Sequence, residues 1–177
     1  AGSRTIGFDF SISMLRSARN RVKHLVQGSA FNLPFRSYSF NVVTCLFVAS
    51  DYSDKKGIIC ESYRILQENG FLLFSDYSLR DEHWKLRRTI RPLLGDKRNI
   101  FLMNEAFLSS EIGKAGFKVQ GIKHMQFQAL FKPERYIKSE EEMKQLRAKN
   151  PDLWNNVQRY IRKKKINREF ILIIGEK

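Results

Sequence analysis

Polar residues follow two short apolar stretches near the start of this 177-residue chain. Asp9 ends the apolar run at residues 5–8, and a turn at residues 28–31 follows the second run at residues 24–27. The apolar spacing after Ser11 predicts a helix between the two runs, which favours a strand–helix–strand unit. Ligands of open parallel sheets lie beyond the carboxyl ends of the strands, so Asp9 and the turn are expected on one rim. A carboxylate there can accept both hydroxyls of a ribose, or it can cap the helix that follows.

A third apolar run, residues 41–47, predicts a central strand buried on both faces. Ser50, Asp51 and Tyr52 follow it on the same rim. Asp51 is the candidate catalytic base, able to accept a proton from a hydroxyl or an amine, although an Asp in such a turn more often serves as a cap. His83 could also act as a base, but such a histidine more often lies on the surface of a helix, and only geometry could promote it to a catalytic role.

The remaining elements continue the alternation of strands and helices. We expect a helix over residues 55–67, ended by Asn69-Gly70, and a strand over residues 71–75. This order predicts an α/β fold with a doubly wound, mostly parallel sheet. Two further segments read as helical, residues 79–98 and an insertion at residues 132–166, and an apolar run at residues 170–174 reads as the last strand.

Four segments, in this order and at this spacing, resemble motifs of the class I (Rossmann-like) S-adenosylmethionine-dependent methyltransferases, in particular the small-molecule-type (UbiE-like) branch. Asp9-Phe10-Ser11 is similar to the second motif of that family, and Gly28-Ser29-Ala30 begins the motif that follows it. The other two segments are residues 39–43 and residues 61–74, which include Glu61 and Arg64. The motif similarity covers residues 4–78, and the resembled fold has an antiparallel last strand.

The resemblance implies S-adenosylmethionine as cofactor and assigns roles to residues of the rim. Asp9 would bind the ribose, Ser29 and Ala30 would lie along the adenine, and Phe10 or Phe31 would pack on the base. Phe47 and Val48 would line the methyl-transfer channel. The implied cofactor-binding set is therefore Asp9, Phe10, Gly28, Ser29, Ala30, Phe31, Phe47 and Val48.

Two features depart from the resembled pattern. The family opens with a strand and a glycine-rich loop, whereas Ala1 stands where the family already enters its second strand, so we expect a fragment, a missing upstream segment or a lost loop. Family members usually carry an acid where Ser29 stands. A hydroxyl accepts a hydrogen bond from the adenine amino group more weakly than a carboxylate does.

The net charge of +14, with a pI near 10, favours an anionic partner such as RNA. Basic residues interleave with Trp84 and Trp154 in the two helical segments, where the aromatic rings either stack on bases or pack in the core. Candidate contacts to substrate or nucleic acid are Trp84, Arg87, Arg88, Arg91, Lys163 and Lys164.

Cys45 and Cys60 show no disulfide or metal spacing and are expected to be buried thiols, which fits a reducing, cytoplasmic compartment. No run is long enough for a transmembrane helix, and no metal site is expected.

The sequence therefore predicts one methyltransferase-like domain over residues 1–177, transferring a methyl group to an N or O atom of a small molecule or RNA. A second hypothesis is a degenerate methyltransferase fold that binds nucleic acid or a protein partner without catalysis. A third, another nucleotide-binding Rossmann domain, lacks support from Leu33-Pro34-Phe35. The oligomeric state and the acceptor are not predicted.

Overall fold

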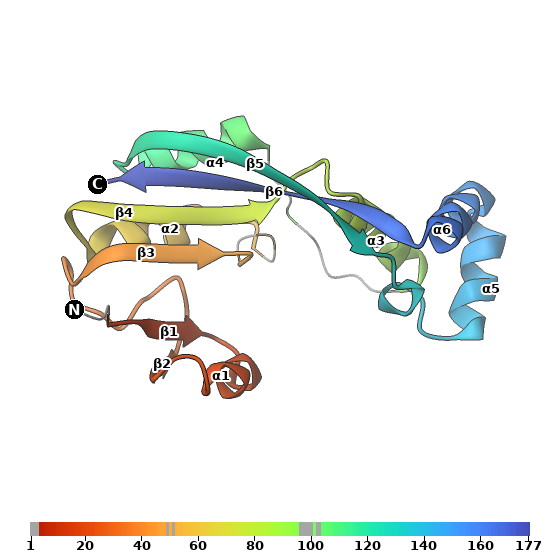
Figure 1. The fold of residues 1–177 in the computed structure, drawn as a ribbon, viewed down its shortest axis with the longest axis horizontal. Coiled ribbons are helices and arrows are strands. Elements are labelled where there is room, and N and C mark those ends of the chain that lie inside the picture. The colour runs from red at the N-terminus through yellow and green to blue at the C-terminus, as the bar shows by residue number, and fades with distance from the viewer. Residues whose placement is uncertain (1–3, 49, 51, 96–100, 102–103) are drawn as a thin grey trace.

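The structure is a computed structural model and describes residues 4–48, 50, 52–95, 101 and 104–177. A small sheet consists of β1 (Ile6–Asp9) and β2 (His24–Gln27), which run parallel with Ile6 opposite His24. Helix α1 (Ile12–Ala18) connects the two strands and lies beside them (Figure 1). The predicted strand–helix–strand unit is confirmed.

The larger sheet has the strand order β3-β4-β6-β5. Its members are β3 (Phe40–Leu46), β4 (Leu66–Tyr77), β6 (Lys165–Glu176) and β5 (Lys118–Leu130). Strands β3 and β4 are parallel, whereas β6 lies antiparallel between β4 and β5, as expected for the last strand. The predicted α/β class is confirmed, but the expected single sheet is present as two, because β3 pairs with neither strand of the small sheet.

One face of the larger sheet carries the first core cluster. Helices α2 (Lys56–Ile65) and α4 (Glu105–Lys114) pack on it with Ile59 and Ile112, which are fully buried. Alternate residues of the strands point at them, among them the fully buried Phe74. The period of two is that of a strand with one face in a core.

The opposite face is open at β3, which corrects the prediction of a strand buried on both sides. Val42 and Leu46 are 50% and 49% exposed, and Phe71 of β4 beside them is 39% exposed. Their alternation with the buried Cys45 shows that the helices of the first core cluster contact only the other face. An apolar run alone could not distinguish one covered face from two.

A second core cluster lies at the far end of the long β5–β6 ribbon (Figure 1). It is built by α3 (Glu82–Leu93), α5 (Glu140–Lys149), α6 (Pro151–Lys163) and the short 3-10 helix η2 (Pro133–Arg135). Ile90, Leu146 and Val157 are fully buried there. Asp81, Asn104, Ser139 and Asn150 each accept a backbone amide at the start of a helix, which fixes where α3 to α6 begin.

Two boundary and burial predictions are wrong. Helix α2 ends at Ile65, and Asn69, with φ of 60°, lies inside β4 instead of ending the helix. The Lys177 side chain takes over the capping role, because its Nζ donates to the carbonyls of Tyr63 and Leu66 at 3.0 and 2.9 Å. Cys60 is exposed, whereas Cys45 is buried and its pKa is raised to about 12, chiefly by that burial.

His83 is buried, not on the surface of its helix as expected. It is 7% exposed, contacts the Tyr136 hydroxyl through Nδ1 and packs edge-on against Trp84. Burial, with smaller contributions from nearby arginines, lowers the pKa of His83 to about 4. The side chain is therefore a neutral part of the second core cluster at pH 7.

We expect His83 to make the fold weaker in mild acid. Since the unfolded chain binds a proton at His83 near pH 6.5 and the folded chain near pH 4, the stabilisation is complete above pH 6.5 and is lost as the pH falls. The loss between pH 7 and about pH 5 amounts to about 2 kcal/mol. Urea unfolding of wild type and His83→Gln at both pH values measures it, with the exposed His24→Gln as control. Equal pH dependence of the wild type and His83→Gln would contradict a neutral, buried His83.

Candidate functional site

Asp9 lies at the carboxyl end of β1, where its side chain holds the turn that leads into α1. Its Oδ1 accepts the backbone amide of Ser11 at 2.8 Å, which fixes the turn into α1. Its other carboxylate oxygen has no hydrogen-bond partner in the part of the chain that the structure describes. One oxygen thus holds the turn while the second stays available to a ligand.

The turn after β2 lies directly against Asp9. The Gly28 amide donates to the Asp9 backbone carbonyl at 3.2 Å. A Cβ on Gly28 would lie 2.9 Å from Cζ of Phe8, closer than real Cβ contacts come, so the neighbouring ring favours glycine. Ser29 is exposed, and its Oγ accepts the Phe31 amide at a long 3.3 Å. The structure therefore brings Asp9 and the predicted adenine-side turn to one rim.

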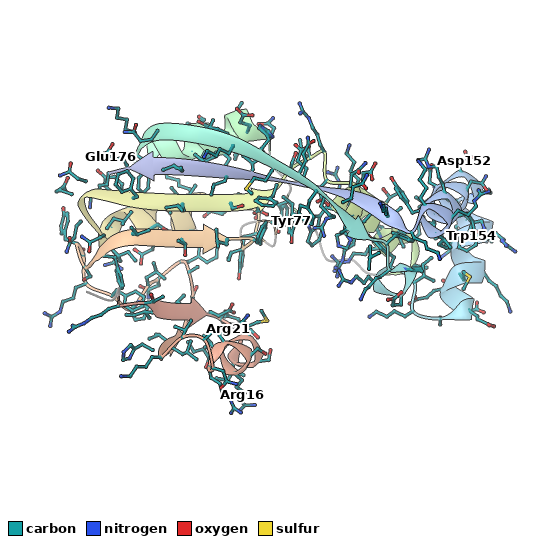
Figure 2. The ribbon with its side chains drawn as sticks, in the orientation of Figure 1. Arg16, Arg21, Tyr77, Asp152, Trp154 and Glu176 are labelled. Atoms are coloured by element: carbon teal, nitrogen blue, oxygen red, sulfur yellow. The ribbon has the colours of Figure 1, made fainter. Side chains whose placement is uncertain are left out.

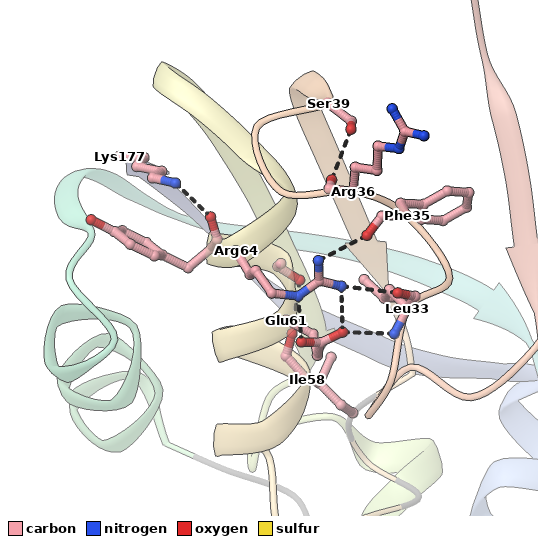
Figure 3. A network of polar contacts seen from close by, with 10 residues as sticks. Leu33, Phe35, Arg36, Ser39, Ile58, Glu61, Arg64 and Lys177 are labelled. Atoms are coloured by element: carbon pink, nitrogen blue, oxygen red, sulfur yellow. Dashed lines mark hydrogen bonds and ion pairs between the residues drawn. The ribbon is translucent and has the colours of Figure 1, made fainter.

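Helix α2 clamps the chain that follows this turn (Figure 3). The Arg64 guanidinium donates to the carbonyls of Phe35 and Leu33 at 2.8 and 2.9 Å, and Glu61 accepts the Leu33 amide at 2.7 Å. Glu61 and Arg64 also pair with each other at 2.8 Å, and this hydrogen bond is the largest cause of the lowered pKa of Glu61. Sequence similarity had marked both residues without a role, and the structure shows that they position the turn.

The aromatic residues of the predicted site have different surroundings. Phe31 packs edge-on against Tyr52, with ring centroids 5.0 Å apart, whereas Phe10 is 71% exposed. Ala30 packs against the first core cluster. That Phe10 or Phe31 packs on the adenine base of the cofactor stays a prediction.

Phe47 and Val48 follow β3, as predicted. Phe47 stacks on Tyr77 at 4.7 Å and has a φ of 59°, a left-handed backbone conformation that is uncommon outside glycine. Val48 packs against the first core cluster. The left-handed turn redirects the chain just where β3 ends, next to the end of β4.

Asp51, the candidate base, lies outside the residues that the structure describes. Another acid, Asp76 near the end of β4, is 5% exposed and uses Oδ1 to accept the Tyr77 amide at 2.7 Å. Its Oδ2 has no hydrogen-bond partner among the described residues. Burial raises the pKa of Asp76 to about 6, against the opposing effects of the Tyr77 amide, Lys55 and Ser50.

Of the two polar neighbours of Asp76, sequence reasoning placed Ser50 on the rim but missed Lys55. Lys55 is 3% exposed and its Nζ donates to the carbonyls of Tyr52 and Phe101 at 2.7 and 2.9 Å. Ser50 is 2% exposed. Lys55 directly precedes α2, and a basic residue in that position gives no local signal that it will be buried beside an acid of β4.

The predicted nucleic-acid contacts divide into packed and exposed residues. Trp84 contacts the rings of Tyr77 and His83 and carries the Arg87 guanidinium over its face at 5.3 Å. Trp154 of α6 is 7% exposed and lies far from Arg16 of α1 and from Arg21, which follows that helix (Figure 2). Exposed members of the predicted set are Arg88, Lys163 and Lys164, while Arg91 is half-buried.

Neither a metal site nor a membrane-spanning helix is found among the described residues. No group of three His, Cys, Asp or Glu side chains among the described residues could hold a metal ion. No described helix has both the length and the apolar character needed to cross a membrane.

Residues 1–74 match the model of a family described as "Methyltransferase domain". A demethylmenaquinone methyltransferase of Corynebacterium kroppenstedtii is 32% identical over 78 residues, which cover 44% of this chain and 34% of the relative. The corresponding enzyme of Thermotoga maritima is 36% identical over 69 residues, 38% of this chain and 30% of the relative. The uncharacterized protein MJ1252 of Methanocaldococcus jannaschii is 24% identical over 119 residues, 67% of this chain and 47% of the relative. The chain thus spans less than half the length of these curated relatives.

Solved structures show similarity over almost the whole chain. A methyltransferase candidate from Bacillus halodurans aligns with a TM-score of 0.72 at 19% identity, over 97% of this chain and 82% of the other. An S-adenosylmethionine-dependent methyltransferase from Archaeoglobus fulgidus aligns with a TM-score of 0.60 at 13% identity, over 97% and 75%. A phosphoethanolamine N-methyltransferase from Haemonchus contortus, in complex with S-adenosylhomocysteine, aligns with a TM-score of 0.58 at 17% identity, over 99% and 44%. At these identities the likeness shows the fold.

Proposed function

Because this chain has the class I methyltransferase fold and its first 74 residues match the methyltransferase domain family, we propose that it is an S-adenosylmethionine-dependent methyltransferase. One observation carries the proposal most directly. At the rim, Asp9 keeps one carboxylate oxygen without a partner among the described residues, beside the turn that its backbone carbonyl holds through Gly28.

The residues of the rim fit the adenosine half of the cofactor. The spare oxygen of Asp9 would accept the ribose hydroxyls, and the exposed Ser29 with the Ala30 amide would lie along the adenine. Phe47 and Val48, at the end of β3, would face the methyl group. The bound cofactor supplies an activated methyl group, and the chain's own task is to orient the cofactor and the acceptor and to exclude water.

The proposed acceptor is an N or O atom of a small molecule or of RNA. The net charge of +14 supports an anionic acceptor, and the exposed Arg88, Lys163 and Lys164 supply cations for it. The relatives from Corynebacterium kroppenstedtii and Thermotoga maritima are demethylmenaquinone methyltransferases, so a quinone belongs in the acceptor screen beside RNA.

Calorimetric titration tests the cofactor site with three ligands: S-adenosylhomocysteine, adenosine and 2′,3′-dideoxyadenosine. We expect saturable binding of the first two, in competition with each other, and much weaker binding of the third, which lacks the hydroxyls that Asp9 accepts. If neither S-adenosylhomocysteine nor adenosine binds, the proposal is wrong. The degenerate fold that binds RNA or a protein without catalysis would then be the hypothesis to test.

A further inference from the structure

A cavity of about 420 Å³ lies where β4 has ended and β5 and β6 continue as a two-stranded ribbon. This volume is within the range of ligand pockets. The charged residues of its lining are two cations and two anions, Arg80, Arg168, Glu82 and Glu169. The lining therefore carries no excess charge of either sign, which favours an uncharged ligand group.

The charged groups of the lining already have partners within the chain. Arg168 donates through Nε to Asp81 at 2.8 Å, and Glu82 accepts the backbone amide of Asn167 at 2.8 Å. Glu169 accepts the Ser78 hydroxyl at 2.8 Å. A ligand of this cavity thus has to be recognised by other groups.

Two side-chain amides of the lining leave one donor and one acceptor unused. Gln128 and Asn167 are opposite each other in the ribbon, and Nε2 of Gln128 lies 3.4 Å from Oδ1 of Asn167. Oε1 of Gln128 and Nδ2 of Asn167 have no hydrogen-bond partner among the described residues, and both side chains are exposed. An acceptor and a donor therefore stand next to each other at the cavity. Phe127, which is 48% exposed, is the aromatic residue of the lining.

An exposed basic run adjoins the cavity. Residues 162–165, Arg-Lys-Lys-Lys, join α6 to β6 (Figure 1). Lys165 is two residues before Asn167, so the two share one face of the strand and lie about 7 Å apart along it. No side chain of the run has a hydrogen-bond or ion-pair partner in the described part of the chain. The nearest acids along the chain, Asp152 and Glu169, are ten and four residues away. The run therefore offers its cations to an external anion such as phosphate.

We propose that the ribbon binds single-stranded RNA, with one unpaired base in the cavity and the neighbouring phosphates on residues 162–165. The edge of an unpaired base presents a donor beside an acceptor, which Gln128 and Asn167 complement, and Phe127 offers apolar surface to its ring. A duplex uses these edges in its own base pairs, so a single strand is favoured. The side-chain amides can also bond the 2′-hydroxyl, which DNA lacks. Use of this RNA as the methyl acceptor rests on the proposed function, but its binding does not.

Fluorescence anisotropy of a labelled octauridylate, with the 177-residue chain and no cofactor, measures the binding. Unlabelled octauridylate, its deoxy form and inorganic polyphosphate of the same length then compete for the site. We expect the polyphosphate to compete on the order of tenfold more weakly than octauridylate, because it has the phosphates without a base. The deoxy form should also compete more weakly. No binding of octauridylate, or equal competition by polyphosphate, would overturn the proposal, and equal competition by the deoxy form would overturn the assignment to RNA.

A matched pair of variants on β5 tests the cavity. Gln128→Ala should weaken octauridylate binding on the order of tenfold and leave its dependence on salt unchanged, because a base contact is lost but no charge. Gln120→Ala makes the same change on the same strand, outside the cavity lining, and should leave binding unchanged. If Gln128→Ala binds as tightly as Gln120→Ala, no base is held in the cavity.

A second pair of variants tests the basic run. Lys163→Gln combined with Lys165→Gln should reduce the slope of log affinity against log salt by about 1.4, as expected for two lost phosphate contacts to a single strand. Lys23→Gln combined with Lys144→Gln removes the same charge at exposed positions of other segments and should leave the slope unchanged. An equal effect of the two pairs would contradict a phosphate site at residues 162–165. Because adenosine binding is measured separately, failure here is distinguishable from failure of the cofactor site.

Discussion

Asp9→Asn is expected to weaken the binding of adenosine and S-adenosylhomocysteine on the order of a hundredfold. The amide still offers Oδ1 to the Ser11 backbone amide, so the turn into α1 is preserved. The second carboxylate oxygen becomes an NH2 group, which cannot accept the ribose hydroxyls, and the charge that strengthened those hydrogen bonds is lost. Calorimetric titration of wild type and variant measures the change.

The chain offers a closely matched control in Asp54→Asn. Oδ1 of Asp54 accepts the amide two residues further on, that of Lys56, at 2.9 Å, just as Oδ1 of Asp9 accepts the Ser11 amide. Both substitutions remove one negative charge and keep one capped amide, but only Asp9 lies at the end of β1. Equal affinity of Asp9→Asn and wild type would show that the ribose does not bind at Asp9.

Arg64→Ala is expected to lower the free energy of unfolding by about 3 kcal/mol. The substitution removes the donors to the carbonyls of Leu33 and Phe35 and leaves the partly buried Glu61 without its cation. The same carbonyls belong to the segment that follows the adenine-side turn, so binding of S-adenosylhomocysteine should weaken as well. Urea unfolding and calorimetric titration measure the two effects.

Two further variants separate charge from geometry at this position. Arg64→Lys keeps the charge but loses the planar fork, so its stability should fall between that of wild type and Arg64→Ala. Arg16→Ala removes an exposed arginine of α1 and should leave stability within about 0.5 kcal/mol of wild type. If Arg64→Ala is as stable as Arg16→Ala, the hydrogen bonds of Arg64 to the carbonyls of Leu33 and Phe35 do not contribute to the free energy of unfolding.

The rim could be predicted because its signals are local. Asp9 and the turn at Gly28 each follow a short apolar strand, and parallel pairing of these two strands is enough to bring them together. The roles of Glu61 and Arg64 could not be predicted in the same way. Leu33 lies 28 residues before Glu61, and Phe35 lies 29 residues before Arg64. Only the packed fold brings these residues within hydrogen-bond distance of each other.

The failures also have physical causes. His83 lies three residues before Leu86 and seven before Ile90, which is the spacing of the buried face of α3, so its burial was there to be read from the pattern. Tyr136, 53 residues later, covers it. The pairing of His124 with Glu105 and Glu169 was also out of reach, because the three residues come from different elements and share no motif. One face of β3 is open because α2 and α4 pack on the other face. The composition of a strand does not show which of its faces a helix will cover.

Strands β5 and β6 contribute to both core clusters and so connect them. Ile173 of β6 is fully buried in the first cluster, whereas Ile166 of the same strand is buried in the second. Helices α5 and α6 are therefore attached to the larger sheet through the same two strands that complete the first core cluster (Figure 1).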